Sequence, residues 1–63
     1  MSLKQYYNKK VIIVATNGKS ISGVVDDYIF PEDNESGLES IVLKTKDGLY
    51  EFTSEDIEKI NII

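Results

Sequence analysis

The middle third of this 63-residue chain holds its most prominent chemical groups, a cluster of carboxylates. Asp26 and Asp27 are adjacent, and Glu32, Asp33 and Glu35 follow within one short stretch. Paired carboxylates can carry out acid–base hydrolysis, and several together can bind calcium. Adjacent residues of a strand point to opposite faces, so Asp26 and Asp27 would not converge on a substrate. The cluster also lacks the alternating acids of a calcium-binding loop, so we expect neither a catalytic residue nor a metal ligand in it.

The same acidic cluster supports two non-catalytic interpretations. It can attract a basic protein surface, or it can form a solvated loop that keeps the protein in solution. Both interpretations stay open. For docking to a basic partner, the contact residues that we expect are Asp27, Tyr28, Glu32, Asp33 and Glu35. No enzyme and no cofactor is expected, because the chain has no histidine and no cysteine for acid–base, thiol or zinc chemistry.

The net charge of −4 hides an uneven distribution along the chain. Residues 1–20 carry four lysines and no acid, whereas residues 21–40 carry six acids and no base. These two parts could meet between neighbouring copies, so we predict self-association, which would also help so short a chain to stay folded. Every cation is a lysine, and nucleic-acid readers rely on arginine, so we expect any nucleic-acid binding to be weak.

The sequence also favours a cytoplasmic location. The opening stretch "MSLKQYYNKK" has no apolar core of the length that a signal peptide needs. The longest apolar run, "VIIVA", is far too short to cross a membrane. The absence of cysteine fits a reducing compartment. We therefore expect a soluble protein without membrane contact.

Runs of β-branched residues separated by turn signals predict an all-β fold. The first strand is expected over residues 10–16, and Asn17-Gly18 directly after it predicts a type I′ hairpin turn. The second strand, over residues 19–30, contains Gly23, which predicts a sharp bend or a close approach of another strand, with a bulge beside it. A short helix with Ser2 as its N-cap is expected before the first strand.

The second half repeats this arrangement. Residues 31–37, "PEDNESG", predict a loop, and residues 38–45 and 49–53 predict two strands joined by a tight turn at "KDG". The last stretch, "EFTSEDIEKINII", fits either an amphipathic helix or a turn and a strand. Thr53 and Asp56 have the spacing of a capping box. We predict one helical turn over residues 54–57 and a final strand over residues 58–63.

Together these elements predict a single domain over residues 1–63, a five-stranded antiparallel SH3-like barrel. The interior of so small a barrel is filled by side chains, which leaves no internal pocket. The predicted core consists of Val11, Ile13, Ile21, Val25, Ile41, Leu43, Phe52, Ile57, Ile60 and Ile62.

The order of elements resembles the Sm-like (LSM) family over most of the chain. "VIIVATNGKSISGVVDDYIF" is similar to the opening motif of that family, and "GLYEFTSEDIEKINI" is similar to its closing motif. The resemblance implies a ring in which the fourth strand of one subunit pairs with the fifth of the next. The acidic charge and the turn pattern also resemble the acidic Sm-like proteins that bind the transcription terminator Rho and relieve termination.

RNA binding by an Sm-like ring is the alternative function that this resemblance implies. Family members that bind RNA carry an arginine or lysine followed by glycine in the closing motif, where this chain has Thr53 and Ser54. Exposed aromatic side chains can stack on bases, although they can equally belong to the core or to an oligomer contact. For the RNA-binding alternative, the expected contact residues are Tyr28, Asn34, Lys44 and Lys46.

Overall fold

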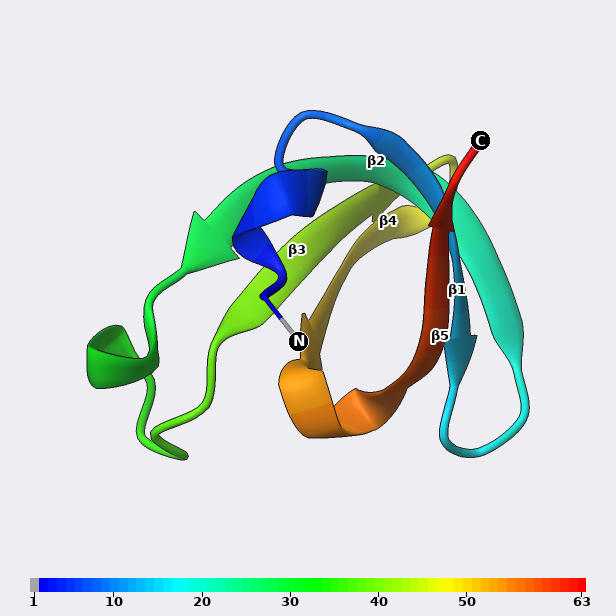
Figure 1. Cartoon of the computed structure of the whole chain (residues 1–63). Coiled ribbons are helices and arrows are strands. Elements are labelled where there is room, and N and C mark those ends of the chain that lie inside the picture. The colour runs from blue at the N-terminus through cyan, green and yellow to red at the C-terminus, as the bar shows by residue number, and fades with distance from the viewer. Residues whose placement is uncertain (1) are drawn as a thin grey trace.

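Five antiparallel strands form one strongly curved sheet in the computed structural model, which describes residues 2–63 (Figure 1). They are β1 (Lys10–Ala15), β2 (Ser20–Ile29), β3 (Ser40–Thr45), β4 (Gly48–Thr53) and β5 (Ile57–Ile62). The spatial order is β4-β3-β2-β1-β5. The predicted all-β, barrel-like architecture of five antiparallel strands is therefore confirmed.

Both predicted tight hairpins are present. Between β1 and β2, the Gly18 N–H donates a hydrogen bond to the Ala15 carbonyl oxygen, so Thr16 and Asn17 are the central residues of the turn. Gly18 has φ +86°, whereas Asn17 is not among the residues with positive φ. The predicted type I′ turn, which needs positive φ at both Asn17 and Gly18, is therefore wrong. The chain uses a longer turn that ends on a left-handed glycine.

Gly23 lies where β2 passes close to β3, as its position in the sequence predicted. A Cβ atom at Gly23 would overlap the Lys44 carbonyl oxygen and would lie 3.1 Å from Leu43 Cγ. The pairing of β2 with β3 begins at Val24 and shifts register between Val25 and Asp27. This bulge lets the long second strand curve across the molecule, because the extra residue bends and twists the chain.

The C-terminal stretch is a turn followed by a strand, as predicted. A single 3-10 turn, η3 (Ser54–Asp56), connects β4 to β5. Asp56 Oδ2 accepts hydrogen bonds from the Thr53 N–H at 2.9 Å and from the Thr53 hydroxyl at 3.1 Å. The expected capping interaction is therefore present at the start of the turn, and the chain is already extended at Ile57, where β5 begins.

The predicted N-terminal helix is reduced to one 3-10 turn, η1 (Lys4–Tyr6), and its N-cap is Leu3 rather than Ser2. Backbone hydrogen bonds explain why the turn is so short. Asn8 has φ +66°, and its N–H donates to the Val25 carbonyl oxygen. The chain is thus already bound to β2 at Asn8, two residues after the turn ends. A second such turn, η2 (Pro31–Asp33), lies in the acidic loop.

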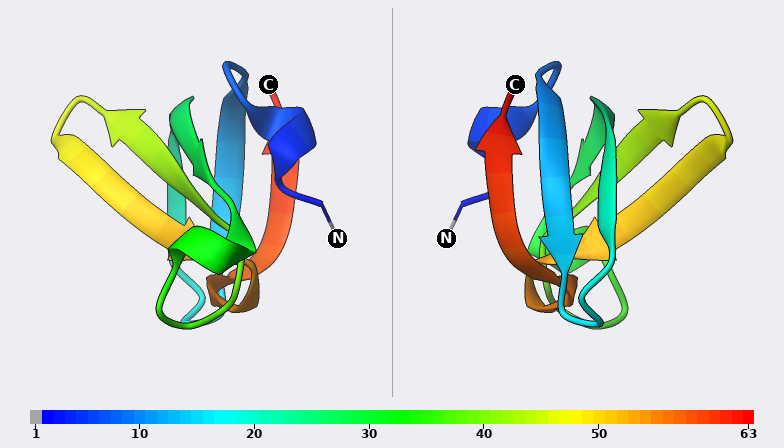
Figure 2. Two further views of the ribbon diagram at one scale, coloured as in Figure 1. Left: turned by 90° about the vertical axis from the view of Figure 1, so that its left-hand side faces the viewer. Right: turned by 90° about the vertical axis from the view of Figure 1, so that its right-hand side faces the viewer.

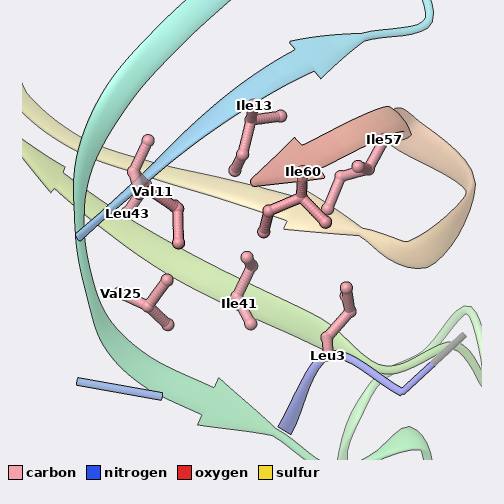
Figure 3. Close-up of a cluster of buried hydrophobic side chains, with 8 residues drawn as sticks. All are labelled: Leu3, Val11, Ile13, Val25, Ile41, Leu43, Ile57 and Ile60. Atoms are coloured by element: carbon pink, nitrogen blue, oxygen red, sulfur yellow. The ribbon is translucent and has the colours of Figure 1, made fainter. Parts of the chain in front are cut away.

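The core lies inside the curve of the sheet, where eight apolar side chains point toward one another (Figure 3). Seven of the predicted core residues are buried there: Val11, Ile13, Val25, Ile41, Leu43, Ile57 and Ile60. Ile21 and Phe52 are partly buried against this cluster. The eighth buried side chain is Leu3, which was not in the predicted core and is 0% exposed.

Ile62 is the one predicted core residue that is wrong, since it is 57% exposed. It pairs with Val11 and lies on the same strand face as Ile60, but it is near the end of β5. Strands β4 and β5 are the two edges of the sheet and are not paired with each other (Figure 2). Ile57 and Ile60 of the same strand are buried, so the core ends before Ile62 is reached.

None of the helical turns within residues 2–63 is long and apolar enough to cross a membrane.

Candidate functional site

An open groove of about 310 Å³ lies at the end of β2, beside the acidic loop. It is lined by Lys4, Tyr7, Asp27, Tyr28 and Phe30. Three of these side chains are aromatic, and the other two carry opposite charges. We call this set the aromatic groove.

Strand geometry places two of the three rings in the aromatic groove. Tyr28 and Phe30 are two residues apart, and alternate residues of an extended chain share one face. Their ring centroids are 5.1 Å apart with an interplanar angle of 86°, which is an edge-to-face contact. Such pairs are favoured because the positive edge of one ring meets the negative face of the other. Phe30 keeps 45% of its surface exposed, so part of its ring is accessible from solvent.

Lys4 brings a cation to the exposed Phe30 ring. Its Nζ atom lies 5.2 Å from the ring centroid, within the range of a cation–π interaction. The η1 turn places Lys4 there, and this turn is anchored by the buried Leu3. Tyr7 follows the same turn and is 51% exposed. The aromatic groove is thus built from two segments that are far apart in the sequence.

Glu39 fixes the orientation of Tyr28. The Tyr28 hydroxyl donates a hydrogen bond to Glu39 Oε1 at 2.9 Å, and the Leu3 N–H donates to the same oxygen at 3.0 Å. Partial burial raises the pKa of the Tyr28 hydroxyl above its usual 10.0, and the hydrogen bond to Glu39 and the charges of Glu39 and Glu32 raise it further. Tyr28 is therefore a neutral hydrogen-bond donor at physiological pH.

The structure brings together only some of the residues expected to contact a basic partner. Asp27 and Tyr28 line the aromatic groove, and the charge of Glu32 acts on the Tyr28 hydroxyl. Glu32 and Asp33 belong to η2, and Glu35 follows in the loop; all three are exposed. Asp33 and Glu35 are not part of the lining of the aromatic groove.

The residues expected for RNA binding are divided between different places. Lys44 and Lys46 line a second groove, of about 550 Å³, together with Lys10, Ser20 and Ser22. Tyr28 lines the aromatic groove instead. The Asn34 side-chain amide donates to the Leu38 carbonyl oxygen at 2.7 Å and to Ser40 Oγ at 3.0 Å, so it holds the loop together.

The lysines of the second groove, which we call the lysine groove, are aligned by strand pairing. Lys10 of β1 is opposite Val24 of β2, and Val24 is opposite Lys44 of β3. Directly opposed residues of antiparallel strands share a face, so Lys10 and Lys44 lie on the same side of the sheet. Asp47 also lines this groove and lowers its net positive charge.

Within residues 2–63, no three acidic, histidine or cysteine side chains gather closely enough to hold a metal ion. The buried polar side chain in the core region, Ser40, is satisfied because its hydroxyl donates to Glu51 Oε2 at 2.9 Å. In the same described part of the chain, every buried side-chain nitrogen or oxygen has a hydrogen-bond partner.

Sequence reasoning missed three members of the aromatic groove. Phe30 follows Tyr28 at strand spacing, so the pair could have been found from alternation. Tyr7 is 21 positions from Tyr28 in the sequence, yet both line one groove with Phe30. Lys4 and Tyr7 gave no local signal, since their position depends on how the N-terminal turn docks on the end of β2.

Comparison of the chain with protein-family models, curated proteins and solved structures found no match. No relative therefore supplies a ligand or a partner for either groove.

Proposed function

We propose that this protein is a non-catalytic binding module that acts through protein–protein contacts, both with further copies of itself and with a basic partner. The observation that carries this proposal is the apolar character of the two unpaired sheet edges. On β4, Leu49 is 63% exposed and Tyr50 is 42% exposed. At the β5 end, Ile62 and Ile63 are 57% and 61% exposed. Large apolar side chains that stay exposed on unpaired edge strands are candidates for contacts with another chain.

Backbone chemistry supports self-association through the same edges. An edge strand presents a row of unpaired N–H and C=O groups that can pair with a strand of another chain. The chain has one such edge at β4 and another at β5. Joining the β4 edge of one copy to the β5 edge of the next would bury Leu49, Tyr50, Ile62 and Ile63. This is the assembly that the Sm-like resemblance implies, and membership of that family is part of the proposal.

The edge contact can be tested by measuring molar mass with light scattering at micromolar concentration. Leu49→Lys and Ile62→Lys each place a charge on one edge, so each should shift the protein toward the monomer. Val24→Lys is the matched control, because Val24 is 40% exposed but lies on the interior strand β2. A wild-type protein that stays monomeric at both low and high salt would refute the self-association.

The acidic cluster supports the second part of the proposal, a basic partner. Glu32, Asp33 and Glu35 are exposed, and residues 21–40 contain no lysine or arginine that could neutralise them. Exposed charges of one sign speed the approach of an oppositely charged partner. Capture of a basic protein from native lysate should be lost when Glu32→Gln, Asp33→Asn and Glu35→Gln are combined. Equal capture by this triple variant and by the wild type would remove the acidic cluster from the proposal.

RNA binding is a second candidate, and the lysine groove is the observation that favours it. Lys10, Lys44 and Lys46 line it with the hydroxyls of Ser20 and Ser22, a set that can bind phosphate oxygens. Labelled oligo-U and oligo-A should then bind in a salt-dependent manner, and Lys44→Ala with Lys46→Ala should weaken binding. Lys59→Ala is the control, because Lys59 is an exposed lysine outside this groove. No binding at micromolar protein would exclude this candidate.

A cytoplasmic location belongs to the same proposal. It is supported by the absence of cysteine, which is typical of proteins that need no disulfide in a reducing compartment.

A further inference from the structure

We propose that the aromatic groove is the specific contact point for the basic partner, and that it binds an arginine side chain of that partner in place of the protein's own Lys4. This inference rests on the proposed function, since it names the chemistry that the partner must present. The groups that recognise the partner's side chain in this inference are aromatic rings, in addition to the carboxylates of the acidic cluster.

The aromatic rings of the groove are accessible from solvent. Phe30 is 45% exposed and Tyr7 is 51% exposed, and both line the same groove as Tyr28. The edge-to-face contact with Tyr28, at 5.1 Å, fixes the Phe30 ring from one side. Aromatic faces carry negative electrostatic potential, so an accessible ring that is held in place attracts a cation.

The aromatic groove already holds a cation of the protein itself. Lys4 Nζ lies 5.2 Å from the Phe30 centroid, so the protein itself shows that an ammonium group fits against this ring. Lys4 belongs to a three-residue turn and its side chain is exposed. A lysine on an exposed, flexible stem can be displaced at low cost, since the ammonium regains its hydration in water.

The carboxylate in the aromatic groove distinguishes an entering arginine from an entering lysine. Asp27 lines the groove beside the rings, and its Oδ1 accepts the Tyr28 N–H at 2.8 Å, which fixes the position of the carboxylate. A guanidinium group is planar, so it can stack flat on an aromatic ring and bond a carboxylate through two parallel N–H groups, whereas an ammonium group acts as a compact point charge. A carboxylate and an aromatic ring that line one groove therefore favour arginine over the resident lysine.

The test compares two blocked peptides of equal charge, hexa-arginine and hexa-lysine, by NMR titration of the full chain at moderate salt. Hexa-arginine should bind more tightly and should shift the resonances of Tyr7, Asp27, Tyr28 and Phe30. Phe30→Leu should weaken hexa-arginine binding about two- to fivefold, the size of one cation–π contact at an exposed site. It should also remove most of the preference for arginine.

Two matched controls separate the groove from general electrostatics. Val24→Ala removes exposed apolar surface outside the groove and away from both sheet edges, and it should leave the affinity unchanged. Lys4→Gln should strengthen binding, because it removes the internal competitor. Lys9→Gln changes the net charge by the same amount at an exposed position outside the groove and should strengthen binding less. Tyr7→Leu serves as a second groove variant if Phe30→Leu lowers the folded fraction.

The outcomes distinguish this inference from the proposed function. If Phe30→Leu and Tyr7→Leu bind like the wild type while the acidic triple variant does not bind, the basic partner stands and the arginine site falls. The arginine site also falls if hexa-arginine and hexa-lysine bind with equal affinity and Phe30→Leu does not change that affinity. If neither peptide binds at all, both the arginine site and the basic partner are overturned.

Discussion

Tyr28 and Leu3, which are 25 positions apart, are joined through one carboxylate oxygen. Glu39 Oε1 accepts the Tyr28 hydroxyl at 2.9 Å and the Leu3 N–H at 3.0 Å. Through this oxygen, the end of β2 and the residue before β3 hold the N-terminal turn against the core. The same contact positions Tyr28 in the aromatic groove and places Lys4 next to Phe30.

Removing the shared acceptor should therefore destabilise the protein. Glu39→Ala leaves the partly buried Leu3 N–H and the Tyr28 hydroxyl without a partner, so we expect a loss of about 1 to 3 kcal/mol in the free energy of unfolding. Urea denaturation gives this value, and hydrogen exchange of the Leu3 amide should speed up. Glu58→Ala, at an exposed position of β5, is the control and should be nearly neutral. Similar losses for both variants would contradict a structural role for Glu39.

The raised pKa of Tyr28 predicts a change of stability in alkaline solution. The folded protein favours the neutral hydroxyl more strongly than the unfolded chain does, so this contribution is complete below pH 10.0 and is lost as the pH rises through the folded-state pKa. In a pH titration followed by tyrosinate absorbance, one tyrosine should ionise at a higher pH than an ordinary tyrosine does. Tyr28→Phe should abolish this late ionisation and flatten the alkaline loss of stability. A late ionisation that persists in Tyr28→Phe would assign it to another tyrosine.

Leu3 should contribute as much to stability as a central core residue. It is 0% exposed and belongs to the same buried cluster as Ile41 and Ile60. Leu3→Ala should cost about 2 to 5 kcal/mol, because it removes buried methyl groups and leaves a cavity. Urea denaturation measures this, and Val24→Ala, at a side chain that is 40% exposed on the interior strand β2, provides the control. A loss below about 1 kcal/mol would mean that the N-terminal turn is not docked in solution.

Gly23 should tolerate no side chain. Gly23→Ala places a Cβ atom against the Lys44 carbonyl oxygen, which is backbone and cannot move without displacing β3. We expect a loss of about 1 to 3 kcal/mol, the usual cost of inserting a methyl group into a packed site. Ser22→Ala, at the exposed neighbouring position, should change stability by less than about 0.5 kcal/mol. Thermal unfolding of the two variants side by side decides whether β2 really passes this close to β3.

The capping interaction before β5 should also be measurable. Asp56→Ala removes the acceptor for both the N–H and the hydroxyl of Thr53, and we expect a loss of about 1 kcal/mol. Glu55→Ala, in the same turn and exposed, is the matched control. If the two variants unfold at the same urea concentration, the cap contributes no stability.

Local patterns in the sequence determined the strands and most of the core. Asn17-Gly18 and "KDG" marked both hairpins, and the spacing of Thr53 and Asp56 indicated the turn before β5. These predictions succeed because turns, caps and alternation depend on residues only a few positions apart. The turn type at Asn17 escaped prediction, since several turns accept that dipeptide.

Tertiary structure alone decided the burial of Leu3, the exposure of Ile62 and the composition of the aromatic groove. Leu3 and Ile62 look alike as apolar residues, but Leu3 is docked against the core through Glu39, whereas Ile62 lies near the end of β5, beyond the buried cluster. Lys4 and Tyr7 meet Phe30 only because the N-terminal turn packs against the end of β2. Contacts between segments so far apart depend on the path of the whole chain, which no short pattern of residues records.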